Sequence, residues 1–63
     1  MLNYIEIGKS YHYIENSTKY TITIRHKIDN DLVAISYLKE GNTESYNSNL
    51  HISSILDRSE NIY

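Results

Sequence analysis

The chain lacks several residue types, and each absence limits what it can be. Its 63 residues include no cysteine, proline, tryptophan or phenylalanine, and only two glycines and one methionine. Without cysteine, disulfide bonds and thiolate metal sites are excluded. A domain of about 60 residues buries only about 60% of the surface that its unfolded chain exposes. Its stability therefore has to come from regular packing, self-association or docking on a larger protein.

Excess charge and long apolar runs are also missing. The net charge is −2, which disfavours capture of nucleic acid by bulk charge. No segment approaches the roughly 18 apolar residues that span a membrane, and no basic N-terminal region precedes an apolar run, as it would in a signal peptide. We expect one soluble, cytoplasmic domain over residues 1–63, with no membrane contact.

Tyrosine is the aromatic residue that the chain does contain. Its seven tyrosines bring large apolar rings with polar tips, which suit half-buried pleated surfaces. Six of them lie in or beside segments that alternate like strands: Tyr4, Tyr11, Tyr13, Tyr20, Tyr37 and Tyr46. We expect these rings both to complete a small β core and to supply a contact surface.

Residues 19–28 carry the strongest strand pattern, because apolar and polar residues alternate throughout. The face predicted to be apolar holds Tyr20, Ile22, Ile24, His26 and Ile28. The cluster Asp29-Asn30-Asp31 predicts a turn, and residues 32–39 predict a second strand. Together these segments predict a β-hairpin with a short loop.

Shorter strands are expected on both sides of the hairpin. One is predicted around residues 11–14, one over 43–46 after a turn at Gly41, and a last one over 50–56. Residues 47–49 are expected to form a loop or a single helical turn. A helix over 53–61 is the alternative at the end of the chain. We expect the core to lie within residues 5–56 and residues 57–63 to fray.

The order of these segments resembles a known superfamily. The chain has I-x-x-G-K-x-Y near its start, then the long strand and its D-N-D turn, then V-A-I-S-Y-L-K-E-G-N-T-E-S-Y and L-x-x-S-S-I-L. The positions that match the superfamily pattern are Val33, Ile35, Tyr37, Glu40-Gly41 and Leu50. Over residues 5–56 the chain resembles SH3-like or Tudor-like barrels. The resemblance implies an all-β, five-stranded small barrel, with room for one short C-terminal helical turn, and leaves the function open.

Three tyrosines are predicted to form a partner-binding surface: Tyr11, Tyr13 and Tyr46. They lie in short strands near loops, where we expect exposure. Tyrosine gives large contact area at low entropic cost, so we predict a non-enzymatic protein-binding module without a cofactor. The Ile-, Asn-, Ser- and Tyr-rich composition resembles small proteins of phages and other mobile elements. An inhibitor or modulator of a host protein, acting in the host cytoplasm, is the specific form expected. Sheet edges leave a homo-oligomer open as well.

Two other binding surfaces are considered. The alternative function is nucleic-acid binding through Lys19, Tyr20, Arg25 and Lys27, with phosphates on the basic residues and a base on the ring. A solvated strand face that discourages aggregation explains the same charges more simply. A cation-binding cage is the less favoured possibility; it would combine Tyr11 or Tyr13, Tyr37 and Tyr46 with Asp29 or Asp31.

Metal and catalytic chemistry are not favoured. The nitrogen ligands available are His12, His26 and His51, and their spacing does not require a metal. A Ser-His-Asp set or a pair of carboxylates could be drawn from the composition, but catalysis needs a cleft and supporting residues that so small a barrel rarely encloses.

Overall fold

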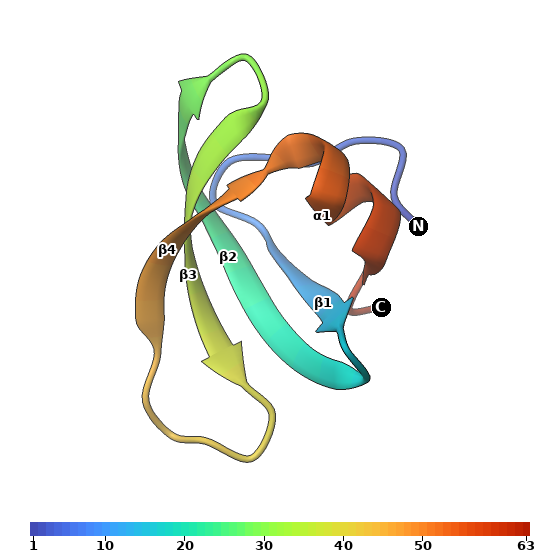
Figure 1. The fold of residues 1–63 in the computed structure, drawn as a ribbon, viewed down its shortest axis with the longest axis vertical. Helices are drawn as coiled ribbons and strands as arrows, with labels where there is room; N and C mark the ends of the chain where they lie inside the picture. Colours follow the sequence, from blue (N-terminus) through green and yellow to red (C-terminus); the bar gives the residue numbers. More distant parts are fainter.

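A computed structural model describes all residues, 1–63, as one antiparallel sheet of five strands with one short helix against it (Figure 1). The elements in chain order are β1 (Ser10–Glu15), β2 (Thr18–Asp29), β3 (Leu32–Lys39), β4 (Tyr46–His51), α1 (Ile52–Arg58) and β5 (Ser59–Glu60). The strands lie in the order β4-β3-β2-β1-β5. The prediction of a small all-β domain with a short C-terminal helical segment is confirmed at this level.

The β2–β3 hairpin forms as predicted, but its alternation changes at a bulge. Ile22 and Ile24 are buried and lie opposite Tyr37 and Ile35. The register shifts between Ile24 and His26, and a bulge of this kind turns the following residues to the other face. The expectation that His26 and Ile28 share the apolar face is therefore wrong. His26 lies opposite Ala34, and both His26 and Ile28 are exposed.

The β1–β2 connection is a tight turn whose two central residues have left-handed backbones. Asn16 has φ 51° and Ser17 has φ 65°. Positive φ at both central positions is the signature of the turn that best matches the twist of an antiparallel hairpin. The turn fixes the register so that Tyr13 lies opposite Tyr20 and Tyr11 opposite Ile22.

The C-terminal part differs from the sequence-based expectation. Residues 43–45, expected to be a strand, form a loop, whereas residues 47–49, expected to be a loop or a single helical turn, belong to β4. The strand predicted over 50–56 is wrong from Ile52 onward, because Ile52–Arg58 is α1. Ile52, Ile55 and Leu56 have the spacing that places apolar side chains on one helical face, and that face packs on the core.

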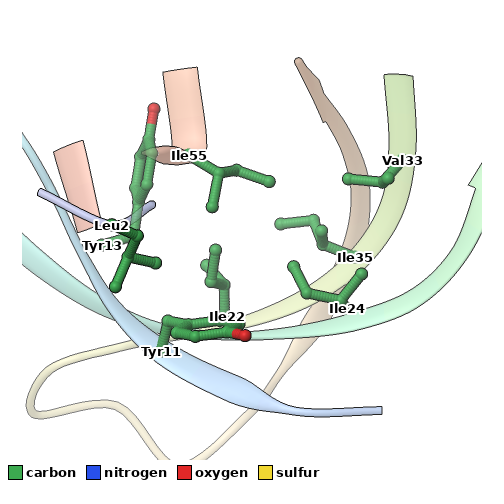
Figure 2. Packing of buried hydrophobic residues seen from close by; sticks show 8 residues of the cluster. All are labelled: Leu2, Tyr11, Tyr13, Ile22, Ile24, Val33, Ile35 and Ile55. Atoms are coloured by element: carbon green, nitrogen blue, oxygen red, sulfur yellow. The ribbon is translucent and has the colours of Figure 1, made fainter. Parts of the chain in front are cut away.

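The core lies between the curved sheet and α1 (Figure 2). Ile55 is fully buried and points from the helix toward the side chains of the sheet, Ile22 among them. The buried cluster consists of Leu2, Tyr11, Tyr13, Ile22, Ile24, Val33, Ile35 and Ile55. The core therefore extends beyond the expected limits of 5–56, since Leu2 joins it and its N–H donates to the Leu56 carbonyl at 2.9 Å.

The first part of the segment expected to fray, residues 57–60, belongs to regular structure, whereas residues 61–63 lie outside any helix or strand and are exposed. Asp57 and Arg58 end the helix, and Ser59 and Glu60 form β5, which pairs with β1. Ser59 is 1% exposed, so this part of the segment expected to fray is packed on the domain.

The sheet is curved, but its hydrogen bonds do not close it into a barrel. Strands β4 and β5 are its two edges, and no strand pairing joins them. The helix α1 contacts β1, β4 and β5 and so lies across the concave side (Figure 1). The other face carries the polar residues of the alternating strands, including Thr21, Thr23 and Ser36, as a sheet with one solvated face should.

Candidate functional site

Four tyrosine rings, one from each of four neighbouring strands, lie in a row on the concave face of the sheet. We call Tyr13 of β1, Tyr20 of β2, Tyr37 of β3 and Tyr46 of β4 the tyrosine row. Successive ring centroids are 6.4, 5.8 and 5.9 Å apart. These separations lie within the range in which aromatic rings attract one another.

Strand register produces this row. Tyr13 lies directly opposite Tyr20, and Tyr37 directly opposite Tyr46. Tyr37 also lies opposite Ile22, the neighbour of Tyr20 on the same face, so the rings of Tyr20 and Tyr37 meet on a diagonal. Opposite residues in an antiparallel pair project to the same face, which is why four separate strands contribute to one surface.

The row borders a shallow groove of about 200 Å³. Its lining, here called the tyrosine groove, consists of Tyr13, Glu15, Tyr20, Ile22, Ile35, Tyr37, Ser48 and Leu50. Tyr46, which is 52% exposed, stands beside this lining at the β4 edge. The helix α1 contacts β1, β4 and β5 on the same concave side, and the tyrosine groove lies on a part of that face that the helix leaves uncovered.

The hydroxyl groups at the two ends of the tyrosine row are held by carboxylates. The Tyr13 hydroxyl donates to Glu15 Oε1 at 3.1 Å, and the Tyr46 hydroxyl donates to Glu44 Oε2 at 3.2 Å. Arg58 Nη1 lies 3.6 Å from the same Glu15 oxygen. Burial raises the pKa of the Tyr13 hydroxyl, and the hydrogen bond and negative charge of Glu15 raise it further. Glu15 is the only charged residue in the groove lining.

The three tyrosines predicted to form the contact surface have different positions. Tyr46 is exposed as expected, but Tyr11 is 1% exposed and Tyr13 is 4% exposed, so the expectation that these two are exposed is wrong. Tyr11 lies in the core, where its hydroxyl oxygen accepts from the Glu6 N–H at 2.9 Å.

Sequence reasoning considered Tyr20 only for nucleic-acid binding and Tyr37 only for a cation-binding cage, and so missed both as residues of a protein-contact surface. Both are only half-buried and line the groove. The usable signal was their place on the apolar face of the hairpin, at the end away from the Asp29–Asp31 turn, where fewer apolar partners remain to cover them.

The four residues predicted for nucleic-acid binding do not form one surface. Lys19 lies opposite Ile14 and Tyr20 opposite Tyr13, and consecutive strand residues project to opposite faces. Arg25 lies at the bulge, and Lys27 follows it opposite Val33, toward the other end of β2. The basic side chains are thus separated from Tyr20 by face or by distance along the strand.

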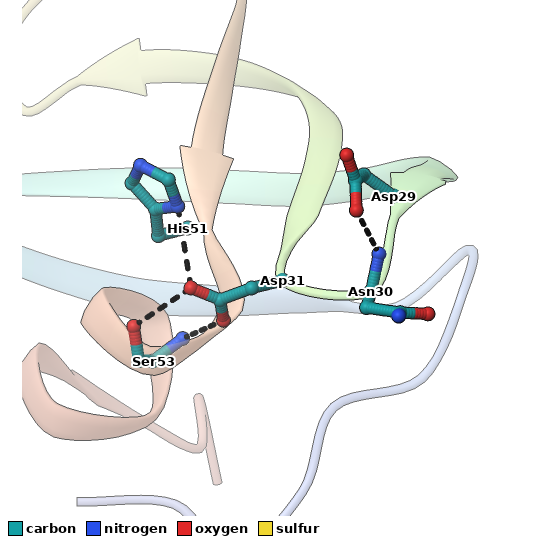
Figure 3. A network of polar contacts seen from close by, with 5 residues as sticks. All are labelled: Asp29, Asn30, Asp31, His51 and Ser53. Carbon is teal, nitrogen blue, oxygen red and sulfur yellow. Dashed lines mark hydrogen bonds and ion pairs between the residues drawn. The ribbon is translucent and has the colours of Figure 1, made fainter.

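A second polar cluster joins the β2–β3 turn to the start of α1 (Figure 3). Asp31 Oδ1 accepts from the Ser53 N–H at 3.1 Å, and Asp31 Oδ2 accepts from the Ser53 hydroxyl at 3.2 Å. His51 Nδ1 lies 3.3 Å from Asp31 Oδ2. In the same turn, the Asn30 N–H donates to the Asp29 carboxylate.

This cluster contains Ser, His and Asp, but not in the order that activates a nucleophile. Activation needs the serine hydroxyl to donate to the histidine, which the aspartate then orients. Here Ser53 and His51 both bind Asp31. The His51 side chain does not cap α1, so Asp31 supplies a capping bond to the helix from another part of the chain.

The remaining candidate ligands lie apart. His12 is on β1, His26 on β2 and His51 on β4, and no group of three or more His, Asp or Glu side chains is arranged to hold a metal ion. Asp29 and Asp31 lie at the opposite end of the β2–β3 hairpin from Tyr20, so the tyrosine row forms no cage with them.

Comparison with known proteins identifies no relatives: no family model, curated protein or solved structure matches this chain. None of its helices has the length and apolar content needed to cross a membrane.

Proposed function

We propose that the chain is a non-enzymatic protein-binding module whose tyrosine groove receives side chains of a partner protein. The observation that carries this proposal is the row of four tyrosine rings on the concave face, in which Tyr20 and Tyr37 are half-buried and Tyr46 is exposed. Packed rings lose little conformational freedom on binding, and tyrosine is enriched in protein interfaces for this reason. The lining is mainly apolar with a few polar groups, as binding sites generally are.

The charge of the groove favours a protein over a nucleic acid. Nucleic-acid backbones are bound chiefly by Lys and Arg, because each phosphate carries a negative charge. The groove lining contains no Lys or Arg, and its one charged residue is the acidic Glu15. The Arg58 guanidinium beside the groove lies 3.6 Å from the Glu15 carboxylate, which offsets its positive charge. Aromatic and aliphatic side chains of a protein fit this surface better.

The proposal also includes a superfamily for the fold and a specific biological role for the module. The curved five-stranded sheet with its short helix supports the SH3-like or Tudor-like assignment suggested by the sequence. A small module whose prominent surface feature is a contact groove acts most simply by occupying a site on another protein. An inhibitor or modulator of a host protein, encoded by a phage or mobile element, remains the specific form that we propose.

Site-specific photocrosslinking tests the proposal. A photoreactive phenylalanine analogue would replace Tyr46, at the edge of the groove, or Tyr4, as the matched control, in the cells where the protein naturally occurs. Tyr46 is 52% exposed and Tyr4 is 67% exposed, so both positions tolerate replacement and reach solvent. Tyr4 belongs to the N-terminal segment and does not line the groove.

We expect position 46 to give an adduct of defined mass with a protein other than a second copy of this chain, and position 4 to give none of that mass. Digestion with nuclease should leave the adduct unchanged. Equal crosslinking from both positions, no protein adduct from position 46, or an adduct removed by nuclease would each contradict the proposal. The last result would favour the nucleic-acid alternative.

A further inference from the structure

Strand β4 is an edge strand with nothing on its outer side. It pairs with β3 alone, from Tyr46 opposite Tyr37 to His51 opposite Leu32. In Figure 1 it runs along the free margin of the sheet, away from the chain termini. One side of its backbone therefore presents unpaired N–H and C=O groups to solvent, which is a template for another strand.

The sequence of β4 contains none of the usual protection against such pairing. Natural edge strands are blunted by Lys, Pro, bulges or short length. β4 has six residues, YNSNLH, with no Lys, Arg, Asp, Glu or Pro, and its pairing with β3 has no register shift. The other edge is different, because β5 has only two residues and includes the charged Glu60.

We propose that β4 pairs antiparallel with β4 of a second copy of this chain, with a two-fold axis at Ser48. The proposal is independent of what the tyrosine groove binds. Antiparallel self-pairing about a two-fold axis uses the same surface of both copies, as a closed dimer requires. The two sheets become one continuous sheet of ten strands, which is within the usual size of twisted sheets.

The register follows from which side chains share a face. Tyr46, Ser48 and Leu50 lie opposite Tyr37, Ile35 and Val33 of β3, so these three project to the concave face. With the axis at Ser48, Tyr46 of each copy lies opposite Leu50 of the other, and Ser48 lies opposite Ser48. This register brings an aromatic ring onto an aliphatic side chain twice, a favourable cross-strand pair.

Neighbouring registers are poorer. An axis at Asn49 would place Leu50 opposite Ser48 and move Tyr46 past the end of the partner's β4. On the other face, the Ser48 register places Asn47 opposite Asn49, so two amides meet and no like charges do. The exposed half of the Tyr46 ring would then be covered, and the two tyrosine grooves would lie side by side.

A charge pair built into β4 tests both the partner and the register. In the proposed dimer, position 47 of one copy lies opposite position 49 of the other. The double variant Asn47→Lys/Asn49→Glu therefore creates two opposite-charge pairs, whereas Asn47→Lys/Asn49→Lys creates two like-charge pairs. Both positions are exposed on the face away from the groove, and circular dichroism would verify folding.

We expect sedimentation to show a concentration-dependent dimer for the wild type between about 1 µM and 1 mM, a range suited to a small interface. The Lys/Glu variant should dimerise at least as tightly, and the Lys/Lys variant about tenfold more weakly than the Lys/Glu variant. A wild type that is monomeric throughout overturns the proposal. Equal dimerisation of the two variants, or weaker dimerisation of the Lys/Glu variant, overturns the β4 interface or its register.

Disulfide crosslinking gives a second test of the dimer. Because the chain has no native cysteine, any disulfide must come from the introduced residue. Ser48→Cys places one thiol from each copy at the two-fold axis, so mild oxidation should give a disulfide-linked dimer. Ser53→Cys, on the exposed surface of α1, is the matched control and should remain largely without a disulfide crosslink, because it lies outside the proposed interface. Equal disulfide crosslinking of the two variants would contradict the proposed two-fold axis. A chain that stays monomeric and pairs its β4 with a strand of another protein would contradict the dimer itself.

Discussion

Tyr20 and Tyr37 meet edge to face on neighbouring strands, with ring centroids 5.8 Å apart and ring planes at 80°. The positive edge of one ring therefore lies against the negative face of the other. Tyr13 and Tyr46 continue the contact on either side. Each ring of the tyrosine row is positioned by its neighbours, so the groove is formed before any partner arrives.

The contact between the rings of Tyr20 and Tyr37 predicts that substitutions at the two positions have non-additive effects on the free energy of unfolding. In a double-mutant cycle with Tyr20→Leu and Tyr37→Leu, urea unfolding should give a coupling free energy of about 0.5–1.5 kcal/mol. The same cycle with Tyr20→Leu and the exposed Tyr4→Leu should be additive within about 0.5 kcal/mol. Equal coupling in the two cycles would show that the ring contact contributes nothing specific.

The environment of Tyr13 predicts a loss of stability at alkaline pH. Burial, followed by the hydrogen bond and charge of Glu15, raises the pKa of Tyr13, so the native state keeps this proton to higher pH than the unfolded chain. The free energy of unfolding from this group is fully present below about pH 10, the unfolded tyrosine pKa, and falls as pH rises through the higher native pKa.

Tyr13→Phe should remove the part of the alkaline loss in the free energy of unfolding that comes from ionisation of Tyr13. Urea unfolding between about pH 8 and pH 11 should show a flatter loss of stability for Tyr13→Phe than for the wild type. Tyr4→Phe, at a 67% exposed position, should follow the wild type. Parallel curves for Tyr13→Phe and the wild type would mean that Tyr13 ionises alike in both states.

Asp31 is predicted to stabilise the start of α1 from the β2–β3 turn. Asp31→Ala removes both bonds to Ser53 and should lower the free energy of unfolding by about 1–2 kcal/mol, the usual cost of a lost helix cap. Asp31→Asn keeps an acceptor and should lose less. Asp57→Ala, an exposed acidic residue on the same helix, should change stability by no more than about 0.5 kcal/mol. A loss for Asp57→Ala as large as that for Asp31→Ala would refute the capping role.

The β1–β2 turn predicts a stabilising substitution. Ser17 has φ 65°, a left-handed conformation that costs a residue with a Cβ about 1 kcal/mol and costs glycine nothing. Ser17→Gly creates the Asn-Gly sequence that such turns prefer, and should raise the free energy of unfolding by about 0.5–1 kcal/mol. Ser36→Gly, inside β3, should lower it. Thermal unfolding distinguishes the two signs.

The β2–β3 hairpin could be predicted from sequence because neighbouring residues along the chain determine its strands and its turn. Period-two alternation sets the faces of Ile22 and Ile24, and the Asp29-Asn30-Asp31 cluster sets the turn. Beyond Ile24 the same pattern misled, because the bulge after Ile24 moves His26 to the other face, and a second register shift follows between Lys27 and Asp29. Nothing in the composition marks either position. His26 was misplaced for this reason.

Strand β4 and α1 were harder to predict because their structure depends on the rest of the fold. YNSNLH has little apolar character, and it is a strand because β3 offers a partner along its whole length. The helix has only seven residues, and its Ile52, Ile55 and Leu56 spacing competes with a strand interpretation of the same letters. The exposure of the tyrosines was hard to predict for the same reason. Tyr11 and Tyr13 are buried because Leu2 and Ile55 of α1 pack in the same cluster, and this packing depends on the complete fold.

The groove is tested most directly by the affinity of the partner segment crosslinked at position 46. Isothermal titration would compare the wild type with Tyr37→Ala and Tyr4→Ala, each verified as folded by two-dimensional NMR. Tyr37 lines the groove and its ring lies between those of Tyr20 and Tyr46, so its truncation should weaken binding about 30-fold or more, as loss of a central interface tyrosine does. Tyr4→Ala should bind like the wild type. A folded Tyr37→Ala variant with wild-type affinity would show that the partner does not bind in the tyrosine groove.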